Sequence, residues 1–150
     1  MAKEINVNSD EVLGEGGTGI IFKGSFKKSA LMAKFGFNEL AIKLLKSSSD
    51  GESASVVESM KYEVAVMTNI PPSPYIVCFV GYSEEPLAIV MKYYASSLSK
   101  LIKTSQEPFE PALLTKIAFE IAFGMDHLHS HGILHLDLKP CKWRQYKTLL

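Results

Sequence analysis

The feature that most constrains the fold of this chain is a cluster of glycines between two apolar runs. From Glu11 the chain reads E-V-L-G-E-G-G-T-G-I-I-F-K-G-S-F, and two β-branched or aromatic segments joined by glycines predict a β-hairpin. Gly14, Gly16 and Gly19 fit the pattern G-x-G-x-x-G. A dinucleotide-binding loop would open a helix, whereas the Ile-Ile-Phe segment after Gly19 favours a strand. A Walker A loop is excluded as well, because no Lys-Ser/Thr pair follows Gly19 or Gly24.

A glycine hairpin of this kind has two interpretations. Glycines let the backbone approach a phosphate closely and present N–H groups to its charge. The alternative is a glycine-rich turn that binds nothing. The three glycines alone do not separate these interpretations, because isolated G-x-G-x-x-G matches are frequent by chance.

Two charged residues interrupt apolar patterns farther along the chain. Residues 38–45 alternate as a strand, which places Lys43 on the same face as Ala41. Residues 56–67 have the period of a helix, and Glu63 lies on its apolar stripe. Each charge either reaches water at the margin of its apolar face, which is the commoner outcome, or meets a group of opposite charge.

The rest of the chain predicts two more strands and two helices. Three prolines at Pro71, Pro72 and Pro74 end the preceding helix. The expected elements are strands over 76–80 and 87–91, a short helix over 98–102 and a long amphipathic helix over 111–129. Residues 27–37 are expected to form a connection of polar-to-mixed composition.

Composition restricts the class of protein. The 150 residues are 47% apolar and 21% charged, which is typical of one globular domain. Sixteen basic and sixteen acidic residues leave no net charge, so we expect no nucleic-acid or membrane partner. The N-terminus lacks the apolar core of a signal peptide, and Cys78 and Cys141 form no disulfide framework. We therefore expect a cytoplasmic or nuclear protein.

Histidines gather near the end of the chain. His127 and His131 are four residues apart and could share a helix face that binds zinc, with Cys141 as a further ligand. Loose histidine clusters predict metal sites poorly. We therefore predict no metal site and expect these histidines to lie on a helix surface or in loop packing.

The segment from Ile133 reads I-L-H-L-D-L-K-P-C-K, and its core resembles the H-R-D-L-K-P-x-N catalytic loop of protein kinases. The glycine loop, A-I-K, a helix-borne Glu, a hinge and H-x-D-L-K-P follow one another over residues 11–140. Lys139, two residues after Asp137, favours the serine/threonine kinases. The E-V-x-x-M and G-M-x-x-L-H segments are most similar to the tyrosine-kinase-like group of that family.

The resemblance implies an α+β fold with a kinase small lobe, which is a five-stranded antiparallel sheet plus helix C, and only the first helices of the large lobe. The implied domains are an N-terminal extension over 1–10, the small lobe over 11–91, a hinge over 92–95, the start of the large lobe over 96–140 and an unmatched tail over 141–150.

The resemblance also assigns roles to residues. Asp137 would orient the substrate hydroxyl, and Lys139 would steady the transferred phosphoryl group. Lys43 would bind phosphates while bridged to Glu63, and Met91 would guard the pocket behind the adenine. The residues implied in binding or supporting ATP are Gly14, Glu15, Gly16, Gly17, Thr18, Gly19, Ile21, Ala41, Lys43, Glu63, Met91, Tyr93 and Tyr94.

Two departures bear on activity. Leu136 stands where the family's Arg is usual, and Lys142 stands where the family has its metal-binding Asn. Mg²⁺ is expected for the family, but a lysine cannot coordinate it. The family pattern stops after Pro140, and no D-F-G follows in these residues. An alternative splice, a frameshift or an error in gene prediction would produce such a loss of pattern. We therefore expect a truncated Ser/Thr kinase that retains ATP binding without turnover; the alternative is a regulatory fragment that binds a nucleotide or a protein partner.

Overall fold

The computed structural model describes residues 4–46 and 53–143. The chain forms two compact units. Unit 1 consists of Met1–Pro71 and Cys78–Tyr93, and unit 2 consists of Pro72–Val77 and Tyr94–Leu150. In the described part of the chain, no helix has the length and apolar character needed to cross a bilayer.

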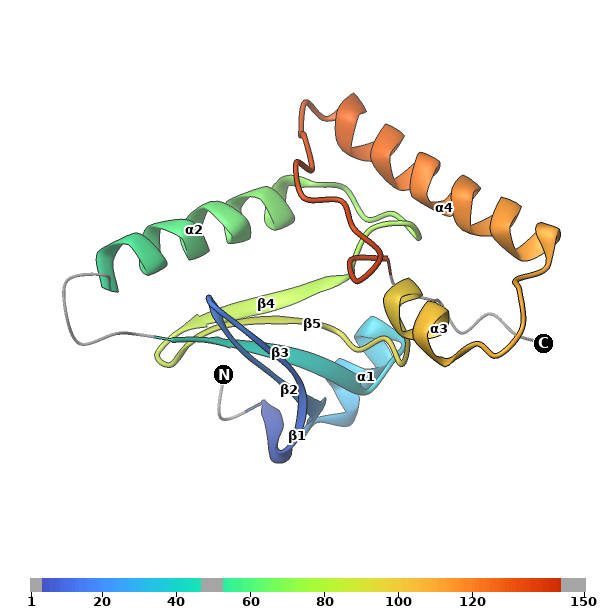
Figure 1. Ribbon diagram of the computed structural model, residues 1–150. Coiled ribbons are helices and arrows are strands. Elements are labelled where there is room, and N and C mark those ends of the chain that lie inside the picture. The colour runs from blue at the N-terminus through green and yellow to red at the C-terminus, as the bar shows by residue number, and fades with distance from the viewer. Residues whose placement is uncertain (1–3, 47–52, 144–150) are drawn as a thin grey trace. The chain divides into compact units, whose positions relative to one another are not determined.

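Unit 1 is built on a five-stranded sheet in which each neighbouring pair is antiparallel (Figure 1). Its strands are β1 (Ile5–Gly16), β2 (Gly19–Phe26), β3 (Glu39–Leu45), β4 (Phe79–Glu84) and β5 (Leu87–Lys92). Their order across the sheet is β1-β2-β3-β5-β4. The α+β class and the five-stranded sheet are thus confirmed.

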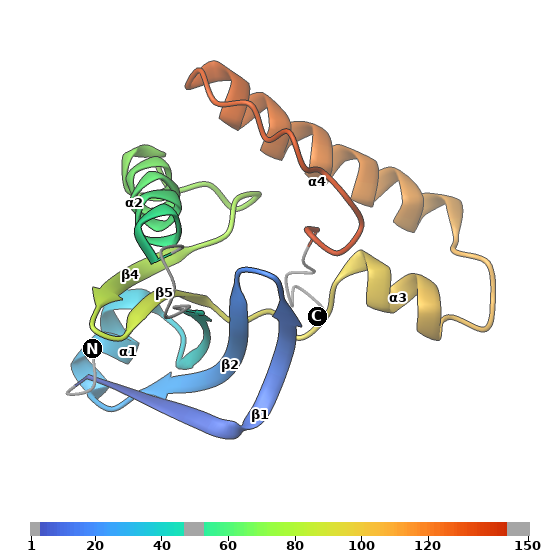
Figure 2. The same cartoon turned by 60° about the vertical axis from the view of Figure 1, so that its left-hand side comes forward.

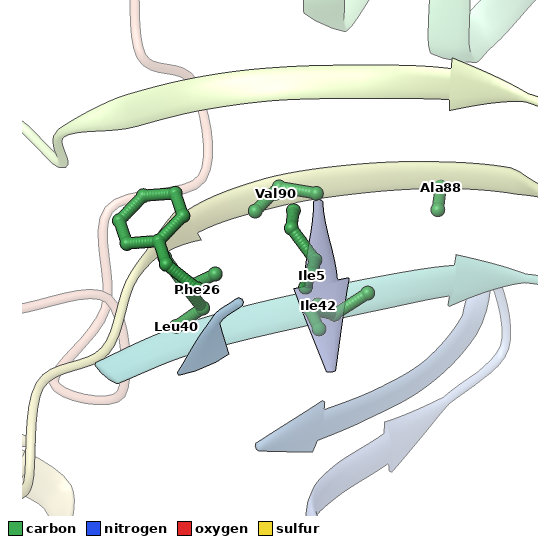
Figure 3. Close-up of a cluster of buried hydrophobic side chains, with 6 residues drawn as sticks. All are labelled: Ile5, Phe26, Leu40, Ile42, Ala88 and Val90. Carbon is green, nitrogen blue, oxygen red and sulfur yellow. The ribbon is translucent and has the colours of Figure 1, made fainter. Parts of the chain in front are cut away.

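The main core lies on one face of this sheet (Figure 3). Because side chains alternate along a strand, Leu40 and Ile42 of β3 point to the same face, and both are 0% exposed. The cluster of buried residues on this face is Ile5, Phe26, Leu40, Ile42, Ala88 and Val90. Ile5 belongs to β1, which begins at that residue, earlier than the hairpin predicted from position 11.

A short helix that was not predicted, α1 (Ser29–Phe35), lies within the connection expected over 27–37 and covers this core. The residues Ser-Ala-Leu-Met-Ala-Lys-Phe include good helix formers, and Gly36 ends the helix with a left-handed φ of 74°. Phe35 stacks on Phe26 with ring centroids 5.3 Å apart. Packing against the core therefore stabilises a helix that is too short to be stable alone.

The long helix of unit 1, α2 (Ser53–Asn69), lies on the opposite side of the sheet from α1 in both views (Figures 1 and 2). It contacts β4 and β5 and buries Met60 to 4% exposure. The strand expected over 76–80 is shifted, because β4 runs from Phe79 to Glu84. The Ile76 N–H donates to Ser73 O at 3.3 Å in a turn and not to a neighbouring strand, which accounts for the later start.

Unit 2 contains α3 (Leu98–Thr104) and α4 (Pro111–Ser130), close to the expected bounds. Along α4, Ile117 and Leu128 are buried, whereas Phe119 and Phe123 on another face are 58% and 50% exposed. A Cβ at Gly124 would lie 3.0 Å from the Tyr75 carbonyl oxygen. The glycine therefore lets α4 approach the segment Pro72–Val77 of the same unit closely.

The N-terminus of α3 holds the loop that follows α4. The first N–H groups of a helix have no partner within it. In α3, Ser97 accepts from Lys100 N through its hydroxyl at 3.3 Å and from Leu101 N through its carbonyl at 2.9 Å. The two remaining N–H groups bond to the loop: Leu98 donates to Trp143 O at 3.2 Å and Ser99 to Pro140 O at 3.1 Å. The N-terminus of α3 therefore binds the loop backbone at both Pro140 and Trp143.

Candidate functional site

Four of the residues expected to bind ATP lie on one face of the unit 1 sheet. Residues directly opposite each other in neighbouring strands share a face. Ile21 of β2 faces Lys43 of β3. Ala41 of β3 faces Met91 of β5 in the same way. By alternation this is the face opposite to the one that carries the main core, so the register gathers Ile21, Ala41, Lys43 and Met91 without any of them being needed for that core.

Lys43 and Glu63 form an ion pair on this face. The Lys43 Nζ donates to Glu63 Oε2 at 2.8 Å, which joins β3 to α2. The two side chains are 19% and 38% exposed, so the pair is neither deeply buried nor freely solvated. Of the two outcomes open for each charge, a partner of opposite charge is the one observed. The lysine still has donors left for an anion, because an ammonium carries three.

The glycines between β1 and β2 divide into two classes. A Cβ placed on Gly14, Gly16 or Gly17 would meet no atom within 4 Å. A Cβ on Gly19 would collide with the carbonyl oxygen of Leu44 in β3. Gly19 is thus required by the close approach of β2 and β3, whereas packing imposes no such need on the other three. Those three leave space beside the backbone, as a phosphate would require.

Glu15 and Thr18 at the hairpin tip are tied to the end of β3. Lys46 Nζ donates to Glu15 Oε1 at 2.7 Å, and the backbone N–H of Lys46 donates to Thr18 O at 3.4 Å. The side-chain hydrogen bond from Lys46 lowers the pKa of Glu15 below its ordinary value. Both ends of the tip thus contact the strand that carries Lys43. Sequence reasoning missed Lys46.

Tyr93 and Tyr94 fall in different units. The Tyr93 N–H donates to Glu39 O at 3.0 Å, and the Lys23 ammonium lies 4.8 Å from the centre of its ring. Hydrogen bonds to Glu39 and Glu11 raise the pKa of Lys23, so that ammonium is held between two carboxylates. Tyr94 lines a cavity of about 80 Å³ within unit 2, beside Tyr75.

The predicted catalytic residues form a second group, within unit 2. Asp137 Oδ2 lies 3.0 Å from Lys139 Nζ and 3.6 Å from Lys142 Nζ. The hydrogen bond from Lys139 is the largest cause that lowers the pKa of Asp137, and Lys142 acts in the same direction. The same contact raises the pKa of Lys139. Sequence reasoning identified Lys142 as unable to bind a metal but did not foresee its contact with Asp137.

Backbone geometry at Leu136 helps to aim Asp137. Leu136 has a φ of 53°, in the left-handed region that costs a branched residue free energy, and its side chain is 91% exposed. The turn is closed by the Asp137 N–H, which donates to His135 O at 2.7 Å and lies 3.2 Å from His135 Nδ1. Leu136 thus adopts a strained conformation in a turn that directs the next side chain toward two lysines.

The residues present around Asp137 do not fit Mg²⁺. The ion prefers an octahedron of oxygen ligands at about 2.0–2.1 Å. The loop instead offers one carboxylate, with two ammonium groups on the same oxygen. No cluster of three or more potential metal ligands occurs among residues 4–46 and 53–143. The rings of His127 and His131 do lie 4.8 Å apart, but His131 Nδ1 is 2.7 Å from His127 O, a hydrogen bond within the helix end.

Comparison with known families gives one match over most of the chain. Residues 7–141 match the model of the family described as protein tyrosine and serine/threonine kinase. A protein named as a probable serine/threonine-protein kinase of Dictyostelium discoideum is 31% identical over 141 residues, covering 89% of this chain and 10% of that protein. A second such protein of the same organism, kinY, is 32% identical over 145 residues, covering 86% of this chain and 23% of the relative.

A third relative comes from a plant. The cyclin-dependent kinase B1-1 of Arabidopsis thaliana is 28% identical over 147 residues, covering 87% of this chain and 45% of that kinase. The chain thus spans less than half the length of each of these relatives. The matched region in this chain includes the glycine hairpin, Lys43, Glu63 and the loop that carries Asp137.

Proposed function

The chain belongs to the protein tyrosine and serine/threonine kinase family, and on that premise we propose that it binds ATP on the sheet face that carries Lys43. The observation that carries the proposal is the Lys43–Glu63 ion pair at 2.8 Å. The pair fixes an ammonium on a half-buried face whose other members, Ile21, Ala41 and Met91, are apolar. An apolar surface with one oriented cation suits a ligand that has both a planar base and phosphates.

Two further features support a nucleotide in this place. Gly14, Gly16 and Gly17 have open space where a side chain would stand, so their backbone is accessible to a phosphate. Lys46 holds the hairpin tip to β3 through Glu15 and Thr18, which keeps those glycines near the lysine-bearing strand. When bound, ATP would supply the transferable phosphoryl group; the chain's own residues would bind and orient it.

The family transfers phosphate to proteins, and the two Dictyostelium relatives are probable serine/threonine kinases by name. In a complete enzyme of this type Asp137 and Lys139 would act on the substrate hydroxyl and on the phosphoryl group. We propose that both residues keep these positions in this chain. These 150 residues, however, carry Lys142 in the place of the metal ligand and contain no D-F-G. We therefore propose that they bind ATP without transferring its phosphate.

The alternative function is that of a kinase-like regulatory module that acts by binding a protein partner. The present observations favour the nucleotide, because Lys43, Glu63 and the open glycines are arranged for an anion. Membership of the tyrosine-kinase-like group and a cytoplasmic or nuclear location remain predictions from the sequence.

Thermal denaturation with and without ATP tests binding. We expect ATP to raise the melting temperature of the wild type and not that of Lys43→Met. The matched control is Lys28→Met, which removes an exposed lysine paired with Glu4 at 3.3 Å and should leave the ATP effect intact. A folded wild type that ATP does not stabilise would refute the proposal.

Transfer of labelled phosphate to a generic protein substrate tests the second part. We expect the wild type to give no more signal than Lys43→Met. Lys142→Asn should also remain at background, because removing one lysine does not add the other metal ligand. Transfer by the wild type above the Lys43→Met background would show that the chain is an active kinase.

A further inference from the structure

A lysine lies beside Asp137 at the loop position where the family resemblance implies a metal-binding Asn. Lys142 Nζ lies 3.6 Å from Asp137 Oδ2, and Lys139 Nζ lies 3.0 Å from the same oxygen. A Mg²⁺ ion bound to that oxygen at about 2.1 Å would lie within roughly 6 Å of both ammonium groups. Like charges at that distance repel, and the carboxylate is already neutralised.

The position of Lys142 is set by the backbone and not only by its side chain. The carbonyls of Pro140 and Trp143, on either side of it, accept hydrogen bonds from α3 at 3.1 and 3.2 Å. Its own N–H donates to Lys139 O at 2.8 Å, which closes a turn. These three bonds fix the backbone from which the Lys142 side chain extends. From that backbone its ammonium reaches Asp137 Oδ2 at 3.6 Å.

From this geometry we infer that the Lys142 ammonium takes the place of a divalent cation beside Asp137, so that the loop excludes divalent metal and ATP binding by the chain does not depend on it. The nucleotide part of this inference rests on the proposed function. The exclusion of metal from the loop does not, because it concerns residues of unit 2 alone. The lowered pKa of Asp137 agrees with it, since the carboxylate is held in its charged form by lysines.

Binding of Mn²⁺ without nucleotide tests the exclusion directly, by the loss of the electron paramagnetic resonance signal of the free ion. We expect the wild type to bind Mn²⁺ no better than Asp137→Asn. Lys142→Asn replaces the ammonium by an amide oxygen and should bind Mn²⁺ at least tenfold more tightly than the wild type. That gain should vanish in the double variant Asp137→Asn with Lys142→Asn.

The matched control is Lys103→Asn, which makes the same change of charge and residue type at an exposed position of α3. It should leave Mn²⁺ binding unchanged. Circular dichroism shows whether each variant is folded. Lys142→Ala serves where the asparagine variant does not fold, and it should bind Mn²⁺ more tightly than the wild type because the repelling charge is gone. Wild-type binding of Mn²⁺ that Asp137→Asn abolishes would overturn the inference, and so would a failure of both Lys142 variants to improve binding.

Calorimetry with ATP in Mg²⁺ and in EDTA tests the consequence. We expect the wild type to bind ATP in EDTA at least as tightly as in Mg²⁺. A tenfold tighter dissociation constant in Mg²⁺ would overturn the inference. Absence of ATP binding in both buffers would refute the proposed function and the nucleotide part together, while the Mn²⁺ measurements would still decide whether Lys142 excludes metal.

Discussion

The ammonium of Lys43 donates a hydrogen bond to Oε2 of Glu63 at 2.8 Å, across 20 residues of sequence. This one contact joins the central strand β3 to α2 and fixes a cation on the sheet face opposite the main core. Both side chains remain partly exposed, at 19% and 38%. The pair is thus placed where it can hold a ligand while adding little to stability.

The free energy of this pair can be measured with a double-mutant cycle of Lys43→Met and Glu63→Gln. We expect a coupling of about 0.2–1 kcal/mol in urea unfolding, because partly exposed ion pairs gain little over their hydrated charges. The exposed pair Lys28 and Glu4 is the control and should give a smaller coupling. A coupling above about 3 kcal/mol would show instead that the pair behaves as a buried ion pair.

The two classes of glycine should respond differently to alanine. Gly19→Ala forces a methyl group against the Leu44 carbonyl, so we expect a loss of about 1–3 kcal/mol. For a chain of this size that loss lowers the melting temperature by roughly 3 to 10 °C. Gly16→Ala meets no atom within 4 Å and should change stability by less than about 0.5 kcal/mol. Equal effects of the two substitutions on the melting temperature would show that β2 and β3 are not packed at Gly19 as described.

Much of unit 1 could be predicted from the sequence. The glycine hairpin, the alternation around Lys43 and the period that puts Glu63 on the stripe of α2 are local patterns, and the structure has each of them. Local patterns could not show which residues of neighbouring strands lie side by side, because the register of β2, β3 and β5 decides that. The family resemblance predicted the Lys43–Glu63 bridge, and the structure contains it.

The errors have physical causes of another kind. The seven-residue helix α1 is too short to show a period, and it is stable because Phe35 packs on Phe26. The residues Ile76 and Val77 favour a strand by type, yet they lie outside β4, and the Ile76 N–H donates to Ser73 O in a turn. The contact of Lys142 with Asp137 depends on a turn of the loop, and a linear sequence does not show which way that turn directs two lysines.

The pKa of Asp137 should be measurably low. Hydrogen bonding to Lys139 lowers it from its ordinary value of 3.8. The charged form of Asp137 is therefore favoured in the folded chain. Its contribution to folding stability is present above the ordinary pKa and is lost as the pH falls through the lowered pKa of the folded chain. Carbon-13 NMR of the Asp137 carboxyl should show a midpoint below that of an unfolded peptide, and Lys139→Met should raise the midpoint. A midpoint unaffected by Lys139→Met would contradict the contact.

The conformation of Leu136 predicts a stabilising substitution. The left-handed φ of 53° destabilises a leucine by roughly 1–2 kcal/mol, whereas asparagine tolerates this conformation. Leu136→Asn should therefore raise the melting temperature. Leu134→Asn is the control: it removes another exposed leucine, one without a positive φ, and should give no such rise. A fall in the melting temperature of Leu136→Asn would mean that the leucine side chain makes a contact that the described geometry lacks.

A titration of the isotope-labelled chain with ATP, in Mg²⁺ and in EDTA, shows by amide chemical shifts whether the Lys43 face of unit 1 binds the nucleotide. We expect saturable shifts confined to residues 14–19, 41–43 and 91–93, and their loss in Lys43→Met. ATP does not bind this face if it moves no amide of a folded sample in either buffer, or if the saturable shifts lie in unit 1 outside those three segments and persist in Lys43→Met.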